Sequence, residues 1–240
     1  MKFALVDGDR HEARSGLKGV CQACSLPMTP KCGQQRVHHW AHRTANCDPW
    51  WEKETQWHRD WKNEFPQDCQ EIRSVGHDGE VHIADVRTPS GTVLEFQHSH
   101  LPFHERRSRE TFYGDMVWIV DRLKNGKDLG RFMGLLAANI PDYGDAIGWR
   151  LPLRRFGLID DWVSSPCPVY LDFGNAEFPG KRLPVIALLW RIRKAHSGRI
   201  IVTPFSRQNI VAHYALGKPM KGFDPHPRPA YWSRDYRTMD

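Results

Sequence analysis

The sequence predicts an α/β protein with three parts. A metal-binding module is expected at residues 1–48, a core with the order helix, three strands, helix, strand at 49–124, and an α+β extension at 125–240. Three observations support this division. Four cysteines crowd into the first part, aromatic residues at helical spacing follow it, and three β-rich runs bounded by turn signals come next.

The composition favours a folded protein with an anionic partner. The chain has 240 residues, 40% of them hydrophobic, and a net charge of +6 that leaves thirteen histidines uncounted. A basic balance suits nucleic acid, although it also describes an ordinary basic surface. The first residues lack a long apolar segment, and the longest apolar runs are far too short to span a membrane. We therefore expect a cytoplasmic protein that binds no membrane, with an oligomeric state that the sequence does not predict.

The cysteines of the first part have the spacing of a zinc site. The candidate ligands are Cys21, Cys24, His42 and Cys47. A C-x₂-C pair followed by an H-x₄-C pair can form a closed, structural Cys₃His site, and zinc could supply the folding energy of such a short module. His39 could replace the histidine and Cys32 the last cysteine. The alternative is a set of free thiols in a small apolar core.

A helix is expected at 49–65, with Asp48 as its N-cap. Glu54, His58 and Lys62 are four residues apart and would share one stripe of this helix. An acidic residue and a histidine on one stripe could position a metal, a phosphate or a water molecule. The same stripe is also typical of a solvated network of i,i+4 pairs.

The expected strands lead to a pair of facing carboxylates. The core elements are predicted at 69–75, 81–88, 92–99, 104–115 and 116–121, and those of the extension at 169–173, 185–192, 199–205 and 206–216, before a loosely ordered tail from 219. A tight turn that pairs Thr88 with Thr92 places Asp85 opposite Glu95, with Cβ atoms about 4.5–5.5 Å apart. Two carboxylates this close need a proton or a cation such as Mg²⁺ between them. Gln97 follows on the same face and could orient a water molecule.

Two alternatives apply to the charged residues of this region. Asp85 and Glu95 could simply pair with arginines on an exposed sheet face. Arg106, Arg107 and Arg109, in the helix that follows, could bind phosphates or form a solvated helix face.

Taken together, these elements resemble the PD-(D/E)XK nuclease superfamily and, more narrowly, the competence protein CoiA-like family. The matching stretches occur in the family's order over residues 20–121. They are CQAC, HHWAH, ETQWHRDWK, HIADVRT, EFQHSH and MVWIVD. The resemblance implies a restriction-endonuclease-like core that hydrolyses DNA phosphodiester bonds with Mg²⁺ or Mn²⁺, in DNA uptake, recombination or defence.

The resemblance also implies the active-site residues. They are Glu54, His58, Asp85, Glu95 and Gln97. The wider superfamily has a lysine where this chain has Gln97, so Lys62 or an arginine of the next helix would have to supply the positive charge. Two other functions stay open: a non-catalytic DNA-binding or recombination accessory protein with the same fold, and a nuclease that acts on RNA.

Overall fold

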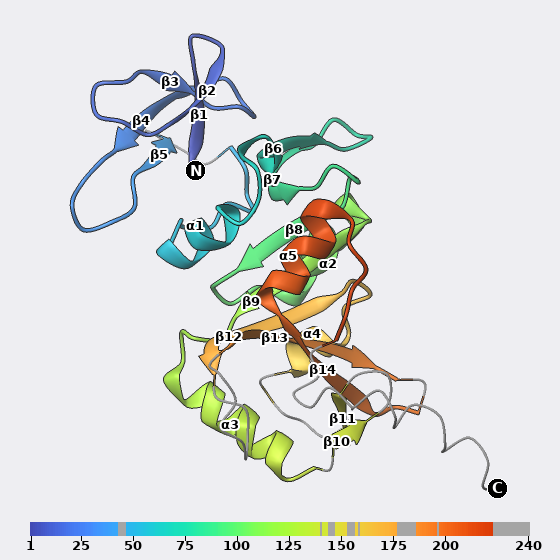
Figure 1. Cartoon of the computed structure of the whole chain (residues 1–240). Helices are drawn as coiled ribbons and strands as arrows, with labels where there is room; N and C mark the ends of the chain where they lie inside the picture. The colour runs from blue at the N-terminus through green and yellow to red at the C-terminus, as the bar shows by residue number, and fades with distance from the viewer. Residues whose placement is uncertain are drawn as a thin grey trace, which may run out of the picture.

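The computed structural model describes residues 1–42, 47–139, 141–143, 147–152, 157, 159–176, 186–195 and 197–222 (Figure 1). Most of the tail that the sequence predicts to be loosely ordered lies outside these residues. The described strands form two sheets. In Figure 1 the N-terminal sheet, coloured blue, lies at one end of the molecule, and α3 (Gly126–Ala137) lies at the other.

The N-terminal module is an antiparallel sheet with a small core. Its strands, in the order β2-β1-β3-β4-β5, are β1 (Phe3–Val6), β2 (Asp9–Glu12), β3 (Gly19–Val20), β4 (Pro27–Lys31) and β5 (His39–His42). The indole of Trp40 is fully buried and packs with Met1, Ala4 and Met28. The module is therefore more regular than the loop-rich segment that its cysteines, glycines and turn formers predict.

The core has the predicted order of helix, three strands, helix and strand. Its elements are α1 (Gln56–Lys62), β6 (Gln70–Val75), β7 (Val81–Arg87), β8 (Val93–Gln97), α2 (Phe103–Tyr113) and β9 (Met116–Asp121), with a short 3₁₀ turn at Gln67–Cys69. Strands β6, β7 and β8 are antiparallel, and β9 runs parallel to β8. The helix between β8 and β9 is the crossover that a parallel pair requires.

The C-terminal residues continue the same sheet. Strand β12 (Val169–Ala176) pairs with β9 in parallel, which gives a nine-stranded sheet of order β10-β11-β14-β13-β12-β9-β8-β7-β6. The other elements are β10 (Pro141–Tyr143), β11 (Ile147–Leu151), α4 (Asp160–Val163), β13 (Ile186–Lys194), β14 (Ile200–Ser206) and α5 (Arg207–Leu216). The sequence predicts β12, β13, β14 and α5, and it misses α3, α4, β10 and β11.

Helix α1 is shorter than the helix predicted at 49–65. Its N-cap is Thr55, whose hydroxyl accepts a hydrogen bond from His58 N while the His58 ring accepts one from Thr55 N. Asp48, the predicted N-cap, instead accepts hydrogen bonds from β7. The prediction is therefore wrong for the first turns, and Glu54 precedes the helix.

The large sheet separates two apolar layers. On one face Trp61 of α1 and Ile210 of α5 are fully buried, and on the other face Phe132 of α3 is fully buried. Asp172 of β12 fixes α1 in place, because its Oδ2 accepts hydrogen bonds from the indoles of Trp57 at 3.0 Å and Trp61 at 2.8 Å. Among the described helices, none has the length and apolar character needed to cross a membrane.

Candidate active site and metal centre

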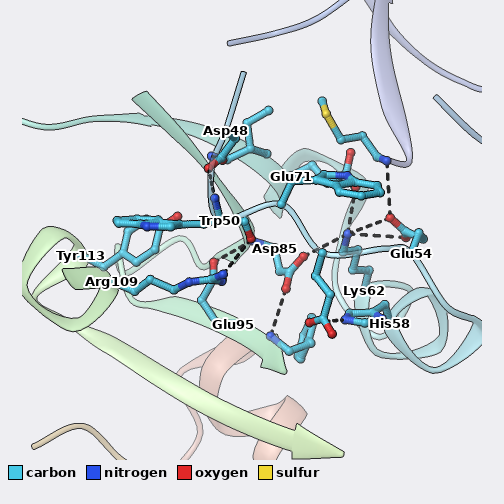
Figure 2. Close-up of a pocket in the computed structure, with 15 residues that line it drawn as sticks. Asp48, Trp50, Glu54, His58, Lys62, Glu71, Asp85, Glu95, Arg109 and Tyr113 are labelled. Carbon is cyan, nitrogen blue, oxygen red and sulfur yellow. Dashed lines mark hydrogen bonds and ion pairs between the residues drawn. The ribbon is translucent and has the colours of Figure 1, made fainter. Parts of the chain in front are cut away.

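A partly enclosed cavity of about 60 Å³ lies where α1, β7, β8 and α2 meet (Figure 2). Six carboxylates line it. They belong to Asp48, Glu52, Glu54, Glu71, Asp85 and Glu95. The permanently cationic side chains in its wall are Lys62 and Arg109. Such an excess of acidic groups in a small space is unfavourable unless protons or further cations offset it.

Asp85 and Glu95 lie where the hairpin of β7 and β8 opens. The last paired residues are Val86 and Leu94, in the register that the sequence predicts. Beyond them Asp85 N donates to Glu95 Oε1 at 3.2 Å, and Phe96 N donates to Asp85 Oδ2 at 3.0 Å. At this point the two side-chain carboxylates accept the hydrogen bonds that backbone carbonyls accept in a regular strand pair. Both carboxylates are thereby held at the cavity wall.

The ammonium group of Lys62 lies among three of the carboxylates (Figure 2). Its Nζ is 2.9 Å from Glu71 Oε1, 3.0 Å from Asp85 Oδ1 and 3.3 Å from Glu54 Oε2. Burial would lower the pKa of Lys62, but these carboxylates raise it well above its ordinary value. Lys62 therefore stays charged and neutralises part of the cluster.

Glu95 and Arg109 form an ion pair in the interior, with Nη1 and Oε2 3.2 Å apart. The alternative that Glu95 pairs with an arginine is therefore correct for Arg109, but the pair is buried and does not lie on an exposed face. Burial, reinforced by Asp85, nevertheless raises the pKa of Glu95 to about 8 against the attraction of Arg109. Glu95 therefore takes up a proton more readily than an ordinary carboxyl group, and a divalent cation bound there would compete with that proton.

We expect the stability of the protein without added divalent metal to fall between about pH 5.5 and pH 8. The pKa of Glu95 is raised from 4.5 to about 8 by folding, so in this window the folded chain binds more protons than the unfolded chain. Glu52 and Glu71 have pKa values lowered to about 2 and titrate below the window. Across this pH window, the melting temperature of the wild type should fall by ~3 °C or more relative to that of Glu95→Gln, which cannot ionise at this position. Melting temperatures that change equally with pH in the two proteins would contradict this.

Glu52 joins the cavity to the end of β8. Its carboxylate accepts hydrogen bonds from Ser99 N at 2.5 Å, His98 N at 3.3 Å and Gln97 Nε2 at 3.1 Å, and it lies 3.5 Å from His58 Nε2. Burial would raise the pKa of Glu52, but the nearby His58 ring and the hydrogen bond from Ser99 lower it to about 2. The Gln97 amide thus binds Glu52, and Gln97 does not line the cavity.

The arginines of α2 differ in environment. Arg106 is 2% exposed and donates to Ser164 Oγ at 2.8 Å and to the carbonyl of Asp161. Arg109 faces the cavity, and only Arg107 of the three has an exposed side chain. Contact of Arg106 with a phosphate would require its hydrogen bonds to break, so a phosphate-binding role for this helix rests mainly on Arg107.

Sequence reasoning missed three of the cavity carboxylates. Glu71 accepts hydrogen bonds from Lys2 N at 2.7 Å and Phe3 N at 2.9 Å, which ties the N-terminal sheet to the cavity. An acidic residue within the strand-like run CQEIRSV is a signal that could have found it. Asp48 and Glu52 resemble helix-capping residues in the sequence, and only the tertiary structure brings them to the cavity.

A second cluster lies in the N-terminal module. It consists of Cys21, Cys24, His42 and Cys47, whose ligand atoms all lie within 4.8 Å of one another. Cys47 Sγ is 3.5 Å from Cys21 Sγ and 3.3 Å from His42 Nε2. Ligands of a tetrahedral zinc ion are about 3.5–3.8 Å apart. The residues therefore fit one structural zinc ion, and they are the quartet that the sequence places first; His39 and Cys32 are outside it.

We expect purified protein to contain one zinc ion per chain, because a closed Cys₃His site requires one. Cys47→Ser should lose the zinc and destabilise the module, whereas Cys32→Ser should keep it. Elemental analysis of the three proteins measures this. Zinc content that depends on Cys32 and not on Cys47 would contradict the assignment.

Comparison of the chain with protein-family models, with curated proteins and with solved structures gives no match. The resemblance described above therefore stays a prediction.

Proposed function

We propose that this protein is a divalent-metal-dependent nuclease that hydrolyses phosphodiester bonds of DNA. The observation that carries the proposal is the placement of Asp85 and Glu95, which lie together where two strands separate, in a cavity with six carboxylates. Mg²⁺ and Mn²⁺ prefer oxygen ligands of this kind and leave positions for water and phosphate. The order of core elements supports the proposal, because it agrees with the fold that the resemblance implies.

The proposed roles follow from the contacts. Asp85 and Glu95 would hold the metal, which when bound polarises the phosphate and supplies hydroxide from water. Lys62 lies 3.0 Å from Asp85 and would provide the positive charge that Gln97 cannot. Gln97 would act through Glu52, whose position it fixes by a hydrogen bond.

A second candidate function, DNA binding without cleavage, is favoured by the same ion pairs. Lys62 and Arg109 already neutralise Asp85 and Glu95, and the amide of Gln97 is engaged with Glu52. In this account the cations replace the metal and the cavity is a structural element. Both accounts agree with the net charge of +6.

Incubation of the protein with supercoiled DNA, linear DNA and RNA tests the proposal. We expect DNA cleavage with Mg²⁺ or Mn²⁺ and none in buffer treated to remove free divalent ions. Ca²⁺ serves as a control, because it takes carboxylate ligands with looser geometry. DNA binding without cleavage in any metal would favour the second candidate, and cleavage of RNA alone would change the substrate.

A further inference from the structure

The segment between Asp48 and α1 has one side toward the cavity and another toward solvent. Glu52 and Glu54 line the cavity, whereas Trp51 and Lys53 are exposed. An aromatic ring and an ammonium group in this segment are therefore both accessible to solvent. Trp51 also contributes to the cavity wall, so the ring lies at the cavity rim.

Trp51 differs from the other tryptophans of this region. Trp50 stacks on His82 with ring centroids 3.2 Å apart, and the indoles of Trp57 and Trp61 donate to Asp172. Trp51 is 39% exposed, and no described residue stacks on its ring or accepts a hydrogen bond from its indole. An indole at a rim, with no partner among the described residues, leaves apolar surface exposed, which a ligand would bury.

The size of the cavity indicates which part of a ligand would contact the Trp51 ring. At about 60 Å³ the cavity can take a cation with a few water molecules, whereas pockets for drug-sized molecules measure ~300–1,000 Å³. A nucleobase next to a phosphate at the cavity would therefore remain outside, at the level of Trp51. Every base has a π-face, so stacking on an aromatic ring tolerates any sequence.

We infer that Trp51 and Lys53 form a rim that binds single-stranded nucleic acid, with a base on Trp51 and a phosphate near Lys53. The inference rests on the proposed function for the role of the cavity. Bases of an intact duplex are stacked on their neighbours, so they would have to unpair before reaching Trp51. The preferred substrate is therefore a single strand or a frayed end, and the chemistry is common to DNA and RNA.

Fluorescence anisotropy without divalent metal tests the inference, with labelled single-stranded DNA of about 12 nucleotides, the same length of RNA and a duplex. Trp51→Ala should weaken single-strand binding about tenfold, since stacking is worth ~1–3 kcal/mol per base, and Trp51→Phe should weaken it less. Lys53→Ala should reduce the salt dependence of binding. Phe103→Ala, which changes a ring that is 64% exposed on α2, is the matched control and should have no effect.

The outcomes separate the two proposals. If Trp51→Ala binds single strands as tightly as the wild type, or if the wild type binds only the duplex, the inference about the rim is wrong. If the wild type nevertheless cleaves DNA with Mg²⁺, the proposed nuclease stands. Binding that depends on Trp51 in a protein that cleaves nothing in any metal would support the rim and overturn the nuclease. Equal losses of affinity for single-stranded DNA and RNA in Trp51→Ala would show that the protein stacks on the base and does not recognise the sugar.

Discussion

The Glu95→Gln variant should cleave DNA roughly 10³-fold more slowly than wild type in Mg²⁺, because the proposed metal loses one of its two carboxylate ligands. Glutamine keeps the shape of the side chain but cannot ionise. Burial and Asp85 raise the pKa of Glu95 to about 8, so folding favours the neutral form of this group. The substitution should therefore leave the melting temperature at neutral pH unchanged or slightly raised. Single-turnover cleavage rates and melting curves measure the two effects.

The matched control is Glu105→Gln. Glu105 pairs with the same Arg109 but lies outside the cavity, so its loss should leave cleavage within about tenfold of wild type. Mg²⁺ should raise the melting temperature of wild type and of this control but not of Glu95→Gln, since stabilisation by a ligand requires its site. Wild-type cleavage by Glu95→Gln would remove Glu95 from the mechanism.

The parts of the site that sequence predicts well depend on local geometry. A tight turn after Thr88 fixes the register of β7 and β8, so the meeting of Asp85 and Glu95 follows from counting residues. The spacing of Cys21 and Cys24 likewise fixes two ligands of the zinc quartet in one turn. In both cases a few consecutive residues determine the arrangement.

The parts that sequence does not predict depend on distant contacts. The helix predicted from Pro49 fails to start there because β7 binds the Asp48 carboxylate and Trp50 stacks on His82. Arg106 is in a polar run, HERRSRE, that is typical of an exposed helix face. It is buried because it packs against α4 and the following turn, to which it donates hydrogen bonds. Neither partner is near in sequence, so no local pattern signals the contact.

Replacing Lys62 with methionine should destabilise the protein by about 3–5 kcal/mol, because removal of one partner leaves buried charges uncompensated. Lys62 is 3% exposed and its ammonium lies within 3.3 Å of Glu54, Glu71 and Asp85. Methionine retains the length and the apolar stem, so the loss reports on charge. The melting temperature should fall by ~6–20 °C. Lys53→Met, on the exposed segment, is the control and should change stability by no more than about 0.5 kcal/mol.

A second substitution identifies the cause of that loss. Of the three carboxylates, Glu54 is the one that accepts no hydrogen bond from a backbone amide among the described residues, so Glu54→Gln disturbs the strands least. Its other partners are Arg59 and, at 3.9 Å, the N-terminal ammonium group. The double variant Lys62→Met/Glu54→Gln should recover part of the stability, and the non-additivity measures the coupling of the two groups. Mg²⁺ should also stabilise Lys62→Met more than wild type, because the ammonium no longer competes for Asp85. Strict additivity together with no response to Mg²⁺ would mean that the carboxylates are protonated and that the cluster is not a cation site.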